Sequence, residues 1–531
     1  MTTVHEKQSE PRNLIRLWLC IVVGVALWFS PTPAGLTNQA WHIFAVFAAT
    51  IASFLLRPLP MGVCVLIGLL VLSTTGELAP SWHGKDTYVK SLGDLPATAS
   101  GALEPLIDDV EPADRVKFAF KKALSGFADT TTWLVVAAFL VAGAMIRSGL
   151  GRRLALALIA RLGGTTLGLG YGIATAELVL GPFVPSNTAR GGGVMAPIVN
   201  SLARALGNEA SASRERQRPE ATNTDGAARY LVLVGAHTNL VTAAMFLTGM
   251  AANPLVSKAA ADVLGVEFGW GRWLLGGIVP GLVSLAALPA VLHWLTRPAP
   301  AAGAAKRQAR EDLAAMGPWT AKQLTLAAVL VGMLAVWASA PLQKLALGYA
   351  PPTAMVALAG VALLVLLGVE RWSDVAGNAA AWDTLVWLGG LITMANALRE
   401  TGFTAWLADG AGGMVGGLPP LAAAVGLAIA YFYSMYAFSM LTGHILAFAG
   451  VLFAAGVGVD APPLLMVALV AYFSNLCGCV TNYSSGPVVI YFGFGYVPIG
   501  RWFAVGFVVS LLHLAVWLGV GLPWWKALGW W

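Results

Sequence analysis

The chain has 531 residues, of which 57% are hydrophobic and only 11% are charged. Soluble domains carry about a quarter charged residues, and the deficit runs along the whole chain, which excludes a soluble protein with one membrane anchor. The net charge of +6 comes from Lys and Arg in short loops, as on the cytoplasmic side of membrane proteins. No basic groove with interleaved aromatic residues suggests nucleic acid as a partner.

Apolar segments near the bilayer-spanning length of roughly 20 residues recur from end to end. The first follows Arg12 and Arg16 without an A-x-A-like cleavage site, which predicts a retained helix and a cytoplasmic N-terminus. Several segments are too short or too broken for simple crossings. They lie near residues 14–29, 41–56, 61–74, 132–147, 165–184, 229–250, 270–295, 320–340, 352–368, 384–398, 420–437, 462–480 and 500–521.

Two polar stretches interrupt this pattern. Residues 76–130 end in a segment with Val116, Phe120 and Leu124 at helical spacing, which predicts a helix lying in the membrane interface. Residues 297–317 are rich in Ala, Pro, Lys and Arg and read as a linker. The expected parts are N-terminal scaffold helices (1–75), a polar loop with an interfacial helix (76–130), a first transport part (131–296), the linker (297–317), second scaffold helices (318–370), a second transport part (371–498) and a C-terminal helix (499–531).

Short matches in the same order suggest that the two halves are repeats. Leu134 to Arg147 is echoed by Leu385 to Arg399, and Thr238-Asn239-Leu240 by Ser474-Asn475-Leu476. Repeated halves are typical of secondary transporters, which bind their substrate near the bilayer midplane where the repeats meet.

Residues 181–193, GPFVPSNTARGGG, place two prolines, three hydrogen-bonding side chains and an arginine inside apolar sequence. Such a stretch is tolerated at membrane depth only where protein or a wet cavity surrounds it. We expect a re-entrant hairpin near 165–205 whose second arm begins at Asn187 or Thr188, with helix-start N–H groups that attract an anion. The alternative is a plain loop at the membrane surface. Glu177, in the first arm, could pair with Arg190 or with a histidine.

The matching place in the second half is residues 438–444, FSMLTGH, within an expected hairpin near 420–456. If Thr188 answers to Thr442, then Arg190 and His444 are potential cations at equivalent positions. Ionisable residues inside a membrane are costly and usually functional, so we expect both to act at the site.

Two more segments resemble broken helices. Residues 235–242 lead to Asn253-Pro254, and residues 474–487 carry a similar density of Gly, Pro and Asn. Unwinding there would turn carbonyls and hydroxyls into ligands, whereas the alternative is helix packing through small residues. The four cysteines lie in apolar context without zinc-site spacing, so no cofactor is expected. The candidate substrate-binding residues are Ser186, Asn187, Thr188, Arg190, Asn239, Thr242, Thr442, His444, Asn475, Thr481 and Asn482.

The stretch Pro185-Ser186-Asn187-Thr188-Ala189-Arg190 followed by two glycines resembles the Ser-Asn-Thr signature of the divalent anion:sodium symporter family. Residues 246–254 and 481–493 resemble its exchanger branch, the citrate/succinate, tartrate/succinate and 2-oxoglutarate/malate translocators. The resemblance implies an all-α polytopic fold of about 11 transmembrane helices, with two inverted repeats that each hold a re-entrant hairpin and a broken helix. It also implies a homodimer, surrounded by lipid, that works by an elevator-like motion.

In the symporters the second hairpin also carries Ser-Asn-Thr, but here Met440 and Leu441 precede Thr442. This departure puts a second sodium site in doubt; any sodium that binds would use Ser186 and Asn187. A dicarboxylate calls for about two positive charges at low dielectric, and fixed cations at Arg190 and His444 or His237 would leave the empty carrier charged. We therefore expect obligate exchange.

The leading hypothesis is a sodium-independent antiporter of C4/C5 dicarboxylates or tricarboxylates in the bacterial inner membrane. A sodium-coupled dicarboxylate symporter is the nearest alternative. An intramembrane enzyme is disfavoured, because the sequence has no G-x-S-x-G or H-E-x-x-H motif. A channel is disfavoured because neither half has a ring of like charges or a carbonyl-filter motif.

Overall fold

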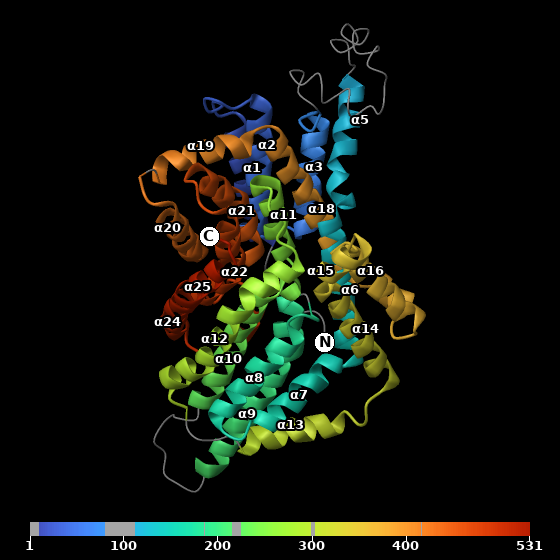
Figure 1. Cartoon of the computed structure of the whole chain (residues 1–531), viewed down its shortest axis with the longest axis vertical. Helices are drawn as coiled ribbons and strands as arrows, with labels where there is room; N and C mark the ends of the chain where they lie inside the picture. The colour runs from blue at the N-terminus through green and yellow to red at the C-terminus, as the bar shows by residue number, and fades with distance from the viewer. Residues whose placement is uncertain (1–9, 80–111, 185, 215–224, 299–302, 416) are drawn as a thin grey trace. The chain divides into compact units, whose positions relative to one another are not determined.

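A computed structural model describes residues 10–79, 112–184, 186–214, 225–298, 303–415 and 417–531. Within these ranges the chain is helical and contains no strand (Figure 1). Seven of the described helices are long and apolar enough to cross a membrane, and four shorter apolar helices accompany them. The expected all-α polytopic architecture is therefore confirmed.

The chain divides into two compact units, Met1–Trp133 with Trp382–Gly410, and Leu134–Ala381 with Ala411–Trp531. The helices of the first unit are α1 (Glu10–Trp28), α2 (Asn38–Leu56), α3 (Met61–Thr74), α5 (Pro112–Ala123), the greater part of α18 (Ala379–Glu400) and the start of α19 (Phe403–Val415). α1 packs along α2, α2 along α3, and α3 along α5. The helix expected around Val116 and Phe120 is thus present as α5.

The second unit begins within α6 (Thr130–Ser148). Its first half continues with α7 (Leu150–Leu162), α8 (Thr166–Leu180), a π-helical turn (Thr188–Met195), α9 (Ala196–Arg214), α10 (Asp225–Met245), a 3-10 turn (Leu247–Gly249), α11 (Asn253–Leu264) and α12 (Trp270–Thr296). α8 and α9 are the arms of the first hairpin, and α10 and α11 are the two parts of the first broken helix.

The rest of the second unit holds the second hairpin and the second broken helix. α13 (Gly303–Ala315), α14 (Ala321–Ala338), α15 (Ala340–Leu347), α16 (Thr353–Leu366) and α17 (Trp372–Ala376) lead to the second hairpin, α20 (Pro420–Ser434) and α21 (Leu441–Gly458). The second broken helix follows as α22 (Pro463–Leu476), a 3-10 turn (Cys477–Val480) and α23 (Gly486–Gly493). α24 (Ile499–Val516), a π-helical turn (Trp517–Gly521) and α25 (Leu522–Ala527) end the chain.

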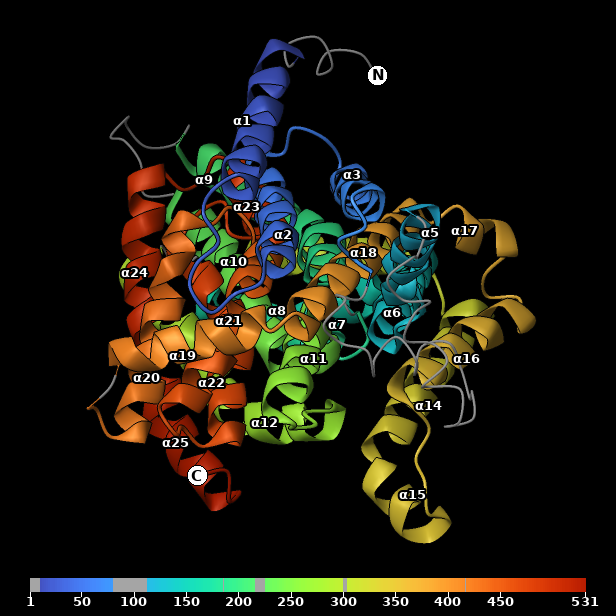
Figure 2. The ribbon, with the colours of Figure 1, turned by 90° about the horizontal axis from the view of Figure 1, so that it is seen from above.

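Helices α10 and α22 form the centre of the second unit. α10 packs against α8, α9, α12 and α22 (Figures 1 and 2). Nearly all of its side chains from Tyr230 to Met245 are fully buried. The side chains of α22 from Leu465 to Leu476 are buried as completely. Polar residues on these helices lie inside protein, where they need hydrogen-bond partners.

One expectation about the broken helices is wrong. Residues 235–242 do not unwind; α10 continues through them to Met245, and the break spans residues 246–252. The Thr238 hydroxyl donates to the carbonyl of Val234 at 2.6 Å, and that of Thr242 to the carbonyl of Thr238 at 3.1 Å. Such bonds one turn back satisfy a polar side chain within a helix. The second break is where the sequence predicts it, between Leu476 and Gly486.

The interval expected to be a linker contains α13, which packs against α7 and α9. The Arg153 guanidinium of α7 donates to the carbonyls of Met316, Gly317 and Pro318 at 2.8 to 3.1 Å. It also lies 5.2 Å from the centre of the Trp319 ring. The end of the linker is therefore fastened to α7.

Candidate functional site

The first hairpin changes direction at Ser186-Asn187-Thr188, and its second arm starts at Asn187 with a π-helical turn. The Ser186 hydroxyl accepts from the backbone N–H of Ala189 at 3.2 Å, so Ser186 caps this arm as expected. Asn187 is 6% exposed, and its Nδ2 has no hydrogen-bond partner among the described residues. Thr188 is exposed. The hairpin therefore presents a helix start and an unused amide donor at its tip.

Arg190, one helical turn into the second arm, is fully buried and uses all of its donors. Its Nε donates to Glu177 Oε2 at 2.7 Å. Nη1 donates to the carbonyls of Val184 and Gly249, both at 3.0 Å, and Nη2 to the carbonyl of Asn239 at 3.3 Å and the hydroxyl of Thr242 at 3.1 Å. An arginine has five N–H groups, so none is left for a substrate.

The expectation that Arg190 is an unpaired cation is therefore wrong. Glu177 and Arg190 form an ion pair in which both side chains are 0% exposed, which confirms the first of the two partners considered for Glu177. The pair is electrically neutral. The Arg190 guanidinium instead joins the hairpin tip, α10 and the break after α10.

Asn239 and Thr242 of α10 complete this network. Asn239 Nδ2 donates to both carboxylate oxygens of Glu177, at 3.3 and 3.1 Å, and to the backbone carbonyl of Asn187 at 3.3 Å. The Thr242 hydroxyl lies 3.3 Å from Glu177 Oε2. Both predicted residues thus face the first hairpin, where they hold Glu177 and the tip in place.

Gly191 permits the close approach of the hairpin to α10. A Cβ atom at this position would lie 2.6 Å from Asn239 Nδ2 and 3.0 Å from Pro487 Cβ. We expect Gly191→Ala to lower the free energy of unfolding by about 1–3 kcal/mol, the usual cost of overpacking, and to lower the melting temperature in detergent. Gly193→Ala is the matched control, because its Cβ would come no closer than 3.5 Å to Ile146. Equal melting temperatures for the two variants would contradict this packing.

The second hairpin holds His444 in an aromatic setting. The His444 ring stacks on Tyr431 with centroids 4.2 Å apart, and Phe438 and Phe448 meet it edge-on. Its Nε2 lies 2.7 Å from the Ser434 hydroxyl. None of these partners is acidic, so His444 differs from Arg190 in having no carboxylate contact among the residues that the structure describes. Thr442 is partly exposed near the start of the same arm.

The break after α22 joins the other elements. Asn475 Nδ2 donates to Asn253 Oδ1 at 2.8 Å, which ties α22 to the break after α10. The Ser484 carbonyl accepts from the Leu441 N–H at 2.8 Å, which ties the break after α22 to the second hairpin. A Cβ at Gly486 would lie 2.7 Å from the Thr188 hydroxyl, so the tip of the first hairpin meets the start of α23.

Several polar atoms around this junction are buried and have no hydrogen-bond partner in the described part of the chain. They are Asn187 Nδ2, Thr481 Oγ1, Asn482 Oδ1 and Ser485 Oγ. Three of these residues were expected from the sequence; Ser485 was not, although it directly precedes the Gly486-Pro487 start of α23. Asn253 was also missed as a site-building residue, and its signal was the adjoining Pro254, which sits in the first turn of α11. The junction therefore offers donors and helix starts suited to an anion.

Helical hairpins and broken helices that meet inside one helical body are features of secondary transporters. The sequence matches the family described as sodium:sulfate symporter transmembrane region over residues 11–531. The chain belongs to this family, which confirms the resemblance found in its motifs. It is a multi-pass membrane transporter and not an enzyme.

The chain is similar to named proteins over nearly its full length. It is 37% identical to a putative malate transporter of Bacillus subtilis, over 99% of this chain and 98% of that protein. It is 34% identical to a chloroplastic dicarboxylate transporter of Spinacia oleracea, over 96% and 81%, and 31% identical to an L-tartrate/succinate antiporter of Escherichia coli, over 95% and 96%. The solved YdaH transporter of Alcanivorax borkumensis shares the fold, with a TM-score of 0.52 over 88% of this chain and 98% of that chain at 15% identity.

Proposed function

We propose that this protein is a sodium-independent antiporter that exchanges C4/C5 dicarboxylates or tricarboxylates across the bacterial inner membrane. The similar proteins named for malate, dicarboxylate and tartrate/succinate transport support the substrate class. A similar protein of Escherichia coli, 34% identical, is named as an inner membrane protein. The basic N-terminal segment supports a cytoplasmic N-terminus.

The hydrogen bonds from Arg190 to backbone carbonyls are the observation that supports sodium independence. Backbone carbonyls at unwound segments are the usual ligands of a coupling cation in secondary transporters. Here two such carbonyls, of Val184 and Gly249, accept from the Arg190 guanidinium, and the Asn239 carbonyl within α10 accepts from it as well. A covalently attached cation thus takes the oxygen ligands that a sodium ion would need. In this account Arg190 positions the hairpin tip and does not touch the substrate.

Because the ion pair is neutral, obligate exchange needs a cause other than an unpaired cation in the empty carrier. Because Glu177 balances Arg190, the empty carrier does not hold an unpaired cation there. It holds unused donors, including Asn187 Nδ2, Thr481 Oγ1 and Ser485 Oγ, and each buried polar group without a partner costs about 1–3 kcal/mol. The carboxylates of a bound substrate would accept from these donors. The loaded carrier therefore crosses more easily than the empty one.

The transport step in this proposal is an elevator-type movement of the hairpins and broken helices within a homodimer. The bonds Arg190–Gly249, Asn475–Asn253 and Leu441–Ser484 link both hairpins and both breaks. Elements joined in this way move as one body, because no internal bond has to break during the step.

Exchange is tested by the dependence of uptake on internal substrate. Purified protein is reconstituted into liposomes in sodium-free potassium buffer, with or without unlabelled malate inside, and uptake of labelled malate is followed. We expect uptake only into the loaded liposomes. Uptake into empty liposomes that requires external sodium would overturn the proposal and indicate a sodium-coupled symporter. Protein-free liposomes are the control for leakage.

A further inference from the structure

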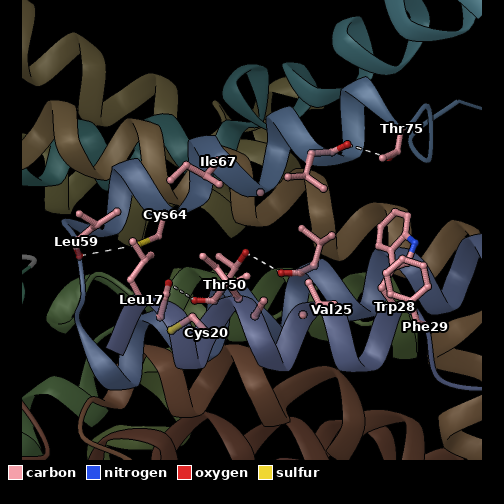
Figure 3. Close-up of a pocket in the computed structure, with 17 residues that line it drawn as sticks. Leu17, Cys20, Val25, Trp28, Phe29, Thr50, Leu59, Cys64, Ile67 and Thr75 are labelled. Carbon is pink, nitrogen blue, oxygen red and sulfur yellow. Dashed lines mark hydrogen bonds between the residues drawn. The ribbon is translucent and has the colours of Figure 1, made fainter. Parts of the chain in front are cut away.

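Helices α1, α2 and α3 of the first unit enclose an apolar groove of about 430 Å³ (Figure 3). Its lining runs from Leu17 and Leu59 at one end to Phe29 and Thr75 at the other. Most of the lining side chains are aliphatic or aromatic, and several along the floor are small.

The hydroxyl side chains in the groove already have hydrogen-bond partners. The Thr50 hydroxyl donates to the Val46 carbonyl at 2.8 Å, and the Ser53 hydroxyl to the Thr50 carbonyl at 2.6 Å. The Thr75 hydroxyl donates to the Val71 carbonyl at 2.8 Å. A groove that offers so little free hydrogen bonding favours a hydrocarbon over a polar solute.

The dimensions match one hydrocarbon chain. Leu17 and Phe29 are 12 residues apart along α1, or roughly 18 Å at 1.5 Å per residue. This length is close to half the thickness of the hydrocarbon core of a bilayer, which is about 30 Å. The groove is therefore as long as one leaflet is deep. A volume of about 430 Å³ spread over roughly 18 Å leaves a narrow channel. A helix of a second copy, about 10 Å in diameter with its side chains, is too wide for it.

Positive charge lies at one end of the groove. Arg16 directly precedes Leu17, and Arg57 ends α2 two residues before Leu59; both arginines are exposed. Arg57 has a φ of 50°, a left-handed conformation that ends the helix. Neither side chain has an acidic partner within the described ranges. This end therefore suits an anionic headgroup, which attracts Lys and Arg at the cytoplasmic surface of a membrane.

We propose that this groove is a binding site for one anionic phospholipid. One acyl chain lies along α1 between α1 and α3, and the phosphate contacts Arg16 and Arg57 at the cytoplasmic face. The site lies in the first unit, while the transport site is built within the second.

Native mass spectrometry of the purified full-length chain tests the proposal. The probes are phosphatidylglycerol and phosphatidylcholine with identical acyl chains, and the quantity measured is the lipid retained per chain. Ile67→Trp fills the groove; Leu66→Trp is its matched control on α3, because the two residues are 46% and 43% exposed but only Ile67 lines the groove. Arg16→Gln with Arg57→Gln removes the charge, and Lys121→Gln, an exposed cation of α5, is the control.

The wild type should retain phosphatidylglycerol roughly 30-fold more tightly than phosphatidylcholine, as expected for two basic residues at a membrane surface. Ile67→Trp should weaken both lipids, the double arginine variant should lose the preference, and both controls should behave as wild type. Equal retention of both lipids by all variants would overturn the site. A loss of dimer mass in Ile67→Trp with lipid retention unchanged would also overturn it, in favour of a second copy in the groove. If Ile67→Trp fails to fold, the arginine variant still decides the outcome.

Discussion

Arg190→Ala is expected to reduce sodium-free exchange to about one hundredth of the wild-type rate or less, and to lower stability by about 3–5 kcal/mol. The substitution removes five hydrogen bonds and leaves the Glu177 carboxylate buried without a counter-charge. Three carbonyls, of Val184, Asn239 and Gly249, lose their donor at the same time. The hairpin tip is then no longer fixed against α10. Counterflow in proteoliposomes measures the first effect, and thermal unfolding in detergent the second.

A double variant separates the structural effect from the functional one. Glu177→Gln combined with Arg190→Ala removes the uncompensated charge, so much of the thermal stability should return. Exchange should not return, because the carbonyl ligands at the hairpin tip still lack their cation. Recovery of both stability and sodium-free exchange would show that Arg190 serves only to neutralise Glu177.

Asn187→Asp should weaken substrate binding by about 100-fold or more. The substitution keeps the shape of the side chain, but it puts an oxygen acceptor where Asn187 Nδ2 now offers an unused donor at the hairpin tip. A carboxylate beside the carboxylates of a substrate is repelled, and a lost hydrogen bond to a charged group costs about 1.5–3 kcal/mol before this repulsion is added. Thermal stabilisation by malate measures the change, because a ligand that binds the folded state raises its stability.

Asn200→Asp is the control for this substitution. Asn200 lies on α9, 13 residues further along the same arm, or roughly 20 Å away at 1.5 Å per residue. Its side-chain oxygen accepts from Tyr496, a bond that an aspartate preserves. Malate should stabilise this variant as it stabilises the wild type. If Asn187→Asp also responded normally, Asn187 would not contact the substrate.

The elements of the site were largely predictable from the sequence because helix breaks in a membrane have strong local signals. Prolines, glycines and capping residues place the turn at Ser186 and the end of α22 near Leu476, and both are observed. The same reasoning named Arg190 as a possible partner of Glu177. These features depend on residues close together along the chain.

The failures involve contacts between distant segments. Whether Arg190 is free depends on Asn239, Thr242 and Gly249, and no local pattern shows that α10 and its break approach the hairpin tip. The break in α10 lies later than the density of Gly and Asn around Thr238 and Thr242 predicts. In the structure their hydroxyls bond to carbonyls one turn back, so the helix continues.

The sodium dependence of counterflow tests most directly whether Arg190 replaces an exchangeable cation. Liposomes loaded with malate exchange it for labelled malate while potassium replaces sodium on both sides at constant ionic strength. We expect the same initial rate at every sodium concentration, including none. An initial rate that falls to the protein-free background without sodium, and rises to saturation as sodium is restored, would contradict it.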